Sequence, residues 1–345
     1  MQKIKIAQIG VGHDHASFIF ESLLKQSDFF EVVGYCVCED EETMYRLHKE
    51  RLYSRSVEMT LEELLNYPGL QAVTVECNEE YLTKYAKMAV DHQLSVHMDK
   101  PGSENHEKFE DMLLEAQEKG LEFHLGYMYR YNPAVQRTME MIKKGTLGQI
   151  YSVDAQMNCL HNPEKRQWLG RFQGGMMFYL GCHLIDLIVQ IQGIPKKIVP
   201  YNKCTGYDGV TAKDFGMAVL EYDQGVSFAK TSAVEPGGFV RRQLVICGEK
   251  GTIEINPLER YIRHSENGRD MVTVMREMYQ EEAVQNGWNY SFDERTYEPF
   301  NRYDDMMRAF ADMVRGEKKN PYTTEYEILL HKLLLQACGY EKETE

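Results

Sequence analysis

A glycine-rich loop near the start of the chain constrains the fold more than any other feature. An apolar run at 4–9 ends at Gly10, and Val11 and Gly12 lead into a helical pattern from about Asp14 to Lys25. A buried strand that turns through glycines into a helix typically begins a sheet of parallel strands with crossover helices. The first glycine permits the tight turn, the second lets a phosphate approach the backbone, and the helix N-terminus offers unpaired N–H groups. The loop therefore predicts a dinucleotide site formed by Gly10, Val11, Gly12, His13 and Asp14.

The alternation of strands and helices continues to about residue 125. Further strands are expected at 31–37, 72–75, 95–98 and 121–125, and helices at 80–92 and from Ser103 to about Gly120. Thr60 and Glu63 have the spacing of a capping box that opens another helix, and Ser103 is expected to cap the helix after it. This order predicts an α/β fold with a doubly wound Rossmann sheet over residues 1–125, which binds ligands at the carboxyl ends of its strands.

The pattern changes after residue 126. Strands joined by short turns are expected at 150–157, 215–222, 226–234, 244–247 and 252–255. Helical patterns occur near 132–144, 175–192, 304–316 and 324–339, whereas 257–300 shows too little periodicity for an assignment. Short turns favour antiparallel pairing. We therefore expect an α+β domain over residues 126–345 with a large, mostly antiparallel, open-faced sheet.

The residue that normally binds the adenosine ribose lies at the end of the second strand. By spacing it is Val37, which cannot accept a hydrogen bond from ribose hydroxyls. Glu39 and Asp40 follow and can substitute for it, and a solvated loop carboxylate is the open alternative for Glu39. No Arg or Lys occurs between 34 and 43, so a 2′-phosphate would find no cation there. We therefore expect NAD in preference to NADP.

His13 and His15 flank Asp14 and raise the question of a metal site. An HxH pair can ligate zinc, but no third and fourth ligand stands at a recognisable spacing. We therefore expect no metal and interpret both histidines as residues of the loop and the helix start. His15 also replaces the third glycine of the dinucleotide fingerprint, which serves helix–strand packing.

The acidic composition excludes several classes of partner. Lys plus Arg total 39 and Asp plus Glu total 53, which gives a formal charge of −14. Such a chain repels nucleic acid and anionic membrane surfaces. No apolar run approaches the ~18 residues of a membrane helix, and the first residues do not resemble a signal peptide. The eight cysteines are scattered without a CxxC pair, as expected for free thiols in the cytoplasm.

Two segments carry groups that can handle charge and protons. Lys100 follows the strand at 95–98, so it lies at the carboxyl edge of the sheet, where a lysine can stabilise a substrate oxygen. An exposed lysine before a turn is the alternative. Tyr179, His183 and Asp186 share a face if their segment is one α-helix. The ordinary pKa of histidine suits His183 for accepting an alcohol proton, and Asp186 can orient the imidazole or bind a hydroxyl. A buried helix with a hydrogen-bonded histidine is the alternative.

These segments together resemble the Gfo/Idh/MocA family of oxidoreductases over most of the chain. IGVG at 9–12 is similar to the family's nucleotide loop, and DKP at 99–101 to its EKP motif. Three further segments of this chain are similar to motifs of the family: GYMYRYNPA at 126–134, GTLGQI at 145–150 and QGGMMFYLGCHLIDL at 173–187. The resemblance implies a nicotinamide cofactor and a homodimer or homotetramer formed through the large sheet.

The resemblance also implies roles for single residues. Lys100 matches the lysine that contacts substrate and nicotinamide, His183 the catalytic histidine, and Asp186 the acid one turn later. Asn132 matches an asparagine that lines the substrate site. The residues implied around the cofactor are Asp99, Lys100, Pro101, Cys77, Asn78 and Tyr81. Independently of the family, the rings of Tyr127, Tyr129 and Trp168 can stack on a hydroxylated ligand or can simply be core residues.

Tyr179 departs from the family pattern, in which an aspartate occupies its position. A phenol is neutral at pH 7 but can donate a proton, so Tyr179 either acts as an acid or fills the pocket. The sequence predicts a dehydrogenase or reductase, dependent on NAD or NADP, that acts on a sugar, a polyol or a related hydroxylated molecule. Two alternatives stay open, a dinucleotide-binding regulator without turnover and an NAD-assisted glycosidase.

Overall fold

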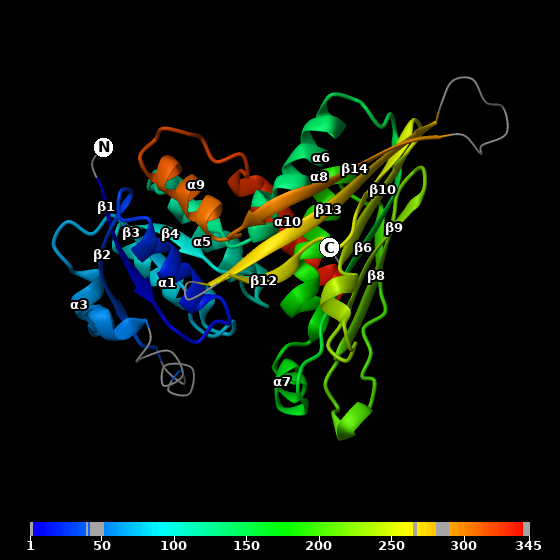
Figure 1. Cartoon of the computed structure of the whole chain (residues 1–345). Helices are drawn as coiled ribbons and strands as arrows, with labels where there is room; N and C mark the ends of the chain where they lie inside the picture. Colours follow the sequence, from blue (N-terminus) through cyan, green and yellow to red (C-terminus); the bar gives the residue numbers. More distant parts are fainter. Residues whose placement is uncertain (1–2, 39–40, 42–51, 265–267, 281–289, 341–345) are drawn as a thin grey trace. The chain divides into compact units, whose positions relative to one another are not determined.

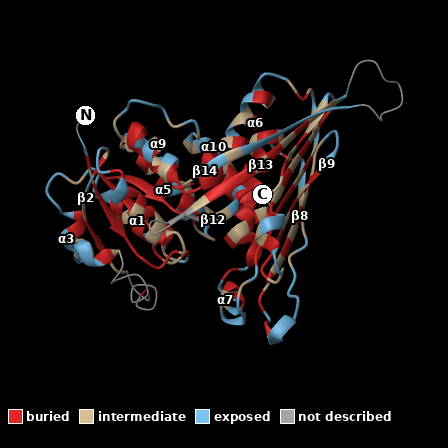
Figure 2. Cartoon of the chain, viewed as in Figure 1, coloured by how far each residue is buried: buried red, intermediate tan, exposed pale blue. Residues whose placement is uncertain are grey.

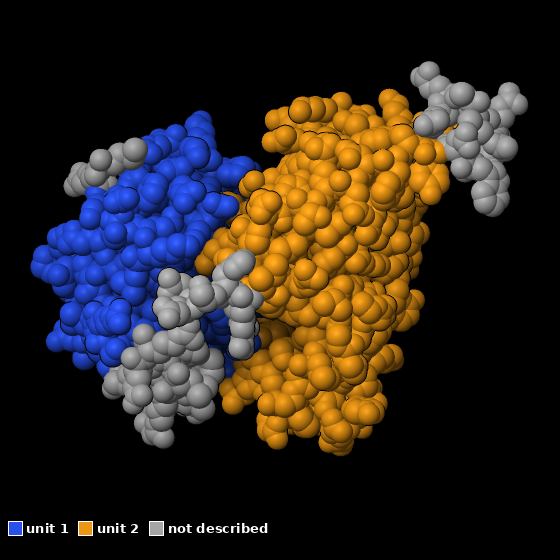
Figure 3. Space-filling model, viewed as in Figure 1, with its two compact units in different colours: residues 1–128, 303–331 blue, residues 129–302, 332–345 orange. Residues whose placement is uncertain are grey.

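The computed structural model describes residues 3–38, 41, 52–264, 268–280 and 290–340. The chain divides into two compact units (Figures 1 and 3). The first comprises Met1–Met128 and Tyr303–His331, and the second Tyr129–Arg302 and Lys332–Glu345. The domain boundary expected at residue 125 stays a prediction. No local pattern in the sequence indicates that residues 303–331 return to the first unit.

The first unit contains a parallel sheet. In the described part of the chain its strands follow the order β2–β1–β3–β4–β5. Their bounds are β1 Ile4–Ile9, β2 Phe30–Cys36, β3 Ala72–Val75, β4 Ser95–Met98 and β5 Phe123–Leu125. Every residue of β3 and β4 is buried, as expected for central strands covered on both faces. The predicted Rossmann sheet is confirmed.

Five described helices belong to this unit in whole. They are α1 Ala16–Lys25, α3 Leu61–Leu65, α4 Leu82–Asp91, α5 His106–Glu118 and α9 Asp304–Val314. Hydrogen bonds from Ser22, Lys25 and Gln26 hold the distant α9 to the end of α1. Ser22 Oγ donates to Oδ1 of Asp304 at 2.8 Å, and Gln26 Nε2 donates to the carbonyl of Asp304 at 3.0 Å.

The two predicted helix caps have different outcomes. The capping box is confirmed, because Thr60 Oγ1 accepts the N–H of Glu63 and the Glu63 carboxylate accepts the N–H of Thr60. The expectation for Ser103 is wrong. Asn105 is the N-cap of α5 and accepts the N–H of Lys108, while Ser103 Oγ accepts the N–H of Asn105. Asparagine caps helices as well as serine does, so the sequence offered two competing sites.

The second unit contains a large mixed sheet. The order of its described strands is β12–β13–β11–β10–β6–β9–β8–β7, with β14 paired to β13. Their bounds are β6 Ile150–Asn158, β7 Lys197–Pro200, β8 Phe215–Glu221, β9 Val226–Ser232, β10 Gln243–Gly248, β11 Gly251–Ile255, β12 Arg260–His264, β13 Gly268–Gln280 and β14 Tyr290–Phe300. β6 and β9 pair in parallel, and the other described pairs are antiparallel. The predicted mostly antiparallel sheet is confirmed.

The helices of the second unit are α6 Pro133–Lys143, α7 Pro163–Trp168 and α8 Cys182–Gln192. The helix α10 Thr324–Cys338 belongs to the first unit up to His331 and to the second unit from Lys332. α8 packs on β6 and β9. Burial alternates along β8 and β10, so one face of these strands is covered and the other is partly open (Figure 2). No helix in the described ranges has the length and apolar character needed to cross a membrane.

Residues 257–300, which the sequence left unassigned, contain β12, β13 and β14. β14 is exposed along nearly its whole length. A strand with neither face in the core has no reason to alternate apolar and polar residues, so its sequence carries no period of two.

Candidate functional site

The glycine loop between β1 and α1 lies against the segment that follows β3. Gly10 has φ +88°, and a Cβ added there would lie 2.5 Å from the backbone nitrogen of Cys77. A Cβ on Gly12 would lie 2.6 Å from Oδ1 of Asn78. Position 10 therefore needs glycine because of its positive φ, and position 12 needs glycine because there is no space for a side chain. The loop has the close-approach geometry that the sequence predicts.

Glu41, which sequence reasoning missed, lies on this loop. Its carboxylate accepts the N–H groups of Val11 at 2.9 Å, Gly12 at 3.0 Å and Cys38 at 2.8 Å. Burial raises the pKa of Glu41, and these backbone hydrogen bonds oppose that shift. The N–H groups of the loop thus already hold an anion. Glu39, the predicted ribose acid, lies outside the described residues. The sequence has four consecutive acidic residues at 39–42, which indicated an acid near the loop. Their spacing could not show that Glu41 is the one that binds it.

The other predicted cofactor residues of this region surround the loop. Cys77 is buried directly after β3, and Tyr81, the N-cap of α4, donates its N–H to the carbonyl of Asn78. His13 donates its N–H to the carbonyl of Glu76 at 2.9 Å, which ties the loop to the end of β3. Asp14 is half-buried. The structure brings Gly10, Gly12, His13, Cys77 and Asn78 together.

Asp99, Lys100 and Pro101 follow β4 and are all buried. Lys100 is only 2 % exposed, so the alternative of a surface lysine is wrong. Oδ1 of Asp99 accepts the N–H of Lys100 at 2.7 Å. Its Oδ2 lies 2.9 Å from Nδ1 of His15 and 3.2 Å from Nδ1 of His13. Burial favours a protonated Asp99, but the imidazoles of His13 and His15, together with Lys100, hold the pKa of its carboxyl well below the usual range.

A second buried acid, Glu76, lies beside this group and was not predicted. Burial, and then the negative charge of Asp99, raises the pKa of Glu76 well above its usual range. Nε2 of His97 lies 3.6 Å from Oε1 of Glu76, and Nδ1 of His97 lies 2.8 Å from Nδ1 of His124. Burial lowers the pKa of His97 to about 4. The polar residues at the ends of β3, β4 and β5 therefore form one buried cluster.

In the second unit, His183 lies in the first turn of α8, directly after a π-helical turn at Met177–Gly181. Such turns are frequent at functional sites. The imidazole is buried and packs edge-on against Tyr129, with 4.9 Å between ring centroids. The hydroxyl of Tyr129 donates to the carboxylate of Glu259. Arg242 donates to the hydroxyl oxygen of Tyr129 and to Oε1 of Glu259, each at 2.8 Å. Burial raises the pKa of Tyr129, so a neutral phenol lies beside His183.

Asp186 is one helical turn after His183 and is held by an arginine. Arg130 donates to it through Nη2 at 2.8 Å and through Nε at 3.0 Å, and Gln190 Nε2 donates at 2.8 Å. Both side chains of the ion pair are buried. The carboxylate therefore has a fixed orientation. Arg130 belongs to the GYMYRYNPA segment, yet its partner could not be predicted from spacing.

Tyr179 lies in the π-helical turn and contacts other aromatic residues. Its ring is 5.7 Å from that of Trp168, and Nζ of Lys165 lies 3.8 Å above Trp168 and 4.7 Å above Tyr179. Tyr179 also belongs to an apolar core that includes Leu169 and Met176. Tyr179 is therefore surrounded by a cation that lies over two rings and by an apolar floor. This arrangement suits the flat C–H face of a sugar as well as a packing role.

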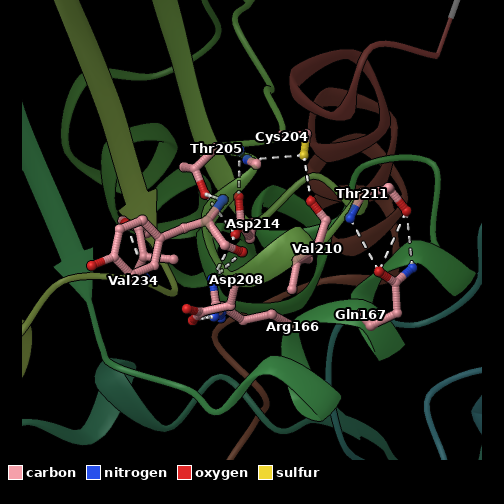
Figure 4. Close-up of polar contacts among 12 residues, drawn as sticks. Arg166, Gln167, Cys204, Thr205, Asp208, Val210, Thr211, Asp214 and Val234 are labelled. Atoms are coloured by element: carbon pink, nitrogen blue, oxygen red, sulfur yellow. Dashed lines mark hydrogen bonds and ion pairs between the residues drawn. The ribbon is translucent and has the colours of Figure 1, made fainter.

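A polar network fixes α7, which carries Trp168, to the loop before β8 (Figure 4). Arg166 pairs with Asp208 and, at 3.4 Å, with Asp214. Gln167 accepts the N–H of Thr211 at 3.1 Å. The Asp214 carboxylate also accepts from the N–H and hydroxyl of Thr205. Because Arg166 is almost wholly buried, these bonds hold α7 and its tryptophan in one place.

The remaining predicted substrate residues are buried. Asn132 is the N-cap of α6, accepting from Ala134 and Val135, and its Nδ2 donates to the carbonyl of Leu258. Its amide is thus engaged in holding the fold. Tyr127 lies in the first unit and is 2 % exposed.

Comparison with known proteins adds independent information. Residues 135–254 match the model of the GFO/IDH/MocA C-terminal domain. The chain is 24 % identical over 192 residues to the uncharacterized oxidoreductase YhhX of Escherichia coli, covering 56 % of this chain and 54 % of that protein. It is 21 % identical over 248 residues to the scyllo-inositol 2-dehydrogenase (NADP(+)) IolW of Bacillus subtilis, covering 70 % of this chain and 67 % of the relative. The chain thus spans about half the length of YhhX and two thirds of IolW.

A solved structure matches over nearly the whole chain. It is that of a putative NADPH-dependent oxidoreductase from Desulfitobacterium hafniense, with a TM-score of 0.80 and 17 % identity. The match covers 98 % of this chain and 95 % of the other. Identity at this level supports the fold alone.

Proposed function

We propose, from the premise that this chain belongs to the Gfo/Idh/MocA family of oxidoreductases, that it transfers hydride between a nicotinamide cofactor and a hydroxylated, sugar-like substrate. The observation that carries the proposal is the glycine loop, whose backbone N–H groups converge on the carboxyl group of Glu41, which a cofactor phosphate would replace. The same loop leaves no space for a Cβ at Gly10 or Gly12. These features fit the phosphates of a dinucleotide.

NAD is the proposed cofactor. The charge of Glu41 on the loop would repel a 2′-phosphate, and no Arg or Lys lies between 34 and 43 to bind one. IolW and the Desulfitobacterium protein carry NADP and NADPH in their names. The cofactor specificity of this chain is therefore proposed from its own residues and not from its relatives.

The bound nicotinamide would supply the hydride acceptor, and the chain would supply charge and proton handling. Lys100 is proposed to hold the substrate oxygen, because its cation is buried at the carboxyl end of β4. His183 is proposed to accept the hydroxyl proton. The neutral Tyr129 beside it and the anchored Asp186 one turn away would fix its orientation and surroundings. Tyr179 and Trp168 would form an aromatic wall for the sugar face.

We propose further that the protein is a cytoplasmic homodimer or homotetramer. All eight cysteines are free thiols, which suits a reducing compartment. Tyr151, Tyr290 and Phe292 are exposed on strands of the large sheet, and exposed aromatic residues favour burial against a second copy. Light scattering on the purified protein tests this assembly.

The first experiment is calorimetric titration with NAD⁺, NADH, NADP⁺ and NADPH, after a check for co-purified nucleotide. Micromolar binding of the NAD pair supports the proposed cofactor. A screen of polyols and sugars for NADH formation then tests turnover. Binding without turnover on any substrate would favour the regulator alternative, and no nucleotide binding would remove the oxidoreductase proposal.

A further inference from the structure

Three side chains with metal-ligating atoms converge at the end of β4 in the first unit. The ligand atoms of His13, His15 and Asp99 all lie within 4.8 Å of one another. Nδ1 of His15 is 2.9 Å and Nδ1 of His13 is 3.2 Å from the same oxygen, Oδ2 of Asp99. Neighbouring ligands about 2.1 Å from one metal ion lie about 3.0 Å apart at right angles and about 3.4 Å apart in a tetrahedron. The two distances therefore suit ligands of one ion.

Hydrogen bonding within the protein does not account for His13. Its Nδ1 accepts the backbone N–H of His15 at 3.2 Å, and a metal ion at Nδ1 would take over the single lone pair that this bond uses. The same nitrogen faces the Asp99 carboxylate. Two acceptor atoms held this close in a buried place repel each other unless a cation lies near both.

The surroundings of the three residues are those of a metal site. Metal-bound histidines usually direct the other ring nitrogen at a carboxylate, and Nε2 of His13 lies 3.6 Å from Oε1 of Glu79. The Glu76 carboxyl is also fully buried near Asp99. The Asp99 carboxylate is oriented by the N–H of Lys100.

We propose that His13, His15 and Asp99 bind a divalent transition metal ion of the zinc class. Two imidazoles and one carboxylate form a three-ligand set that leaves at least one position for water or another oxygen ligand. The His15 side chain is 13 % exposed and provides the access route. The ion would tie the start of α1 to the end of β4. This proposal does not depend on dehydrogenase activity.

The HxH pair indicated two of the ligands, but the sequence could not supply the third, which is why no metal was expected from it. The third ligand, Asp99, is 84 residues from His15 and belongs to a different strand–helix unit. Only the parallel sheet, which places the ends of β1 and β4 at one edge, brings the three residues together.

The test uses the full-length protein after treatment with a chelator. Zn²⁺ and Co²⁺ are titrated by calorimetry, and Co²⁺ binding is also followed by absorbance. The variants are His15→Gln and Asp99→Asn, which keep side-chain size, with His92→Gln on the exposed end of α4 as the control. Circular dichroism confirms that each variant is folded.

We expect one ion per chain, binding at least about 100-fold weaker in His15→Gln and in Asp99→Asn, and unchanged binding in His92→Gln. The Co²⁺ spectrum should lack a thiolate charge-transfer band, since no cysteine is among the ligands. A Zn²⁺-dependent rise in melting temperature should be lost in both variants. The proposal is overturned if no ion binds, if both variants bind like the parent, or if the Co²⁺ spectrum shows cysteine ligands.

Discussion

At the scale of single residues, Glu41 places a negative charge on the glycine loop. In Glu41→Gln the side chain keeps its size and loses that charge. We expect the ratio of NADP⁺ to NAD⁺ affinity to rise about 10-fold, because a like charge is removed from the surroundings of a 2′-phosphate. Calorimetric titration with both nucleotides measures the ratio. The exposed acid Glu62 provides the control Glu62→Gln, and an unchanged ratio in Glu41→Gln would exclude a role in cofactor choice.

The second prediction for a single residue concerns the role of Lys100 in turnover. In Lys100→Met the buried stem is kept and the ammonium is lost. We expect kcat to fall about 10²- to 10³-fold, because the charge that stabilises the substrate oxygen is missing. Cofactor Kd should change little. Steady-state kinetics and nucleotide titration separate the two effects, and Lys84→Met on the exposed face of α4 is the control. Near-parental turnover would remove Lys100 from the mechanism.

At the scale of elements, the buried pair of Arg130 and Asp186 joins the segment before α6 to α8. In Arg130→Met the carboxylate of Asp186 stays buried and loses its arginine, while Gln190 still donates to it. We expect the free energy of unfolding to fall by about 3–5 kcal/mol, as for other broken buried pairs. Urea denaturation measures the loss. Arg130→Met combined with Asp186→Leu should recover much of it, and a double variant as unstable as the single one would show that packing, and not charge, is responsible.

The helices and strands differ in how well they could be predicted from the sequence. β1, β3 and β4 were predicted to the residue, because buried parallel strands appear as uninterrupted apolar runs. The strand β14 was missed because it is exposed on both faces. The residues of the glycine loop and Lys100 were found from local motifs. Glu41 and Glu76 were not, since the glycine loop and Asp99 that they contact are distant in sequence and only the fold brings them together.

The same limit applies to the helix that carries His183. Its sequence predicts one continuous α-helix over 175–192, whereas the structure has a π-helical turn at Met177–Gly181 before α8. A π turn depends on one extra residue in the hydrogen-bond ladder, which hydrophobic periodicity does not register. Tyr179 accordingly has Trp168 and Lys165 as neighbours, and His183 has Tyr129.

At the scale of the whole molecule, His331 links stability to pH. It lies in α10, and its Nε2 is 2.6 Å from the carbonyl of Ser103. Burial lowers its pKa from 6.5 to about 3. The unfolded chain therefore binds a proton between pH 6.5 and pH 3 that the folded chain does not, so stability is complete above pH 6.5 and falls as the pH drops through this window.

Lowering the pH from 7.5 to 5 should reduce the free energy of unfolding of both proteins. We expect this reduction to be about 2 kcal/mol larger in the parent than in His331→Gln. Denaturation curves at the two pH values, compared between the proteins, give the difference. The control is His92→Gln, whose histidine is exposed and should leave the parental pH dependence intact. Equal pH dependence in the parent and His331→Gln would show that His331 does not titrate in this window.

The discontinuous first unit has a consequence for the order in which the chain is made. Its sheet is complete in sequence by residue 128, but α9 and the rest of Tyr303–His331 are synthesised about 200 residues later. At about 5–20 residues per second, a ribosome needs roughly 10–40 s to cover that interval. During this time the surface destined for α9, including Ser22, Gln26 and the ring of His124 that stacks on Phe310, has no cover from its own chain. The nascent protein would therefore present an apolar and polar patch to chaperones until its last helices emerge.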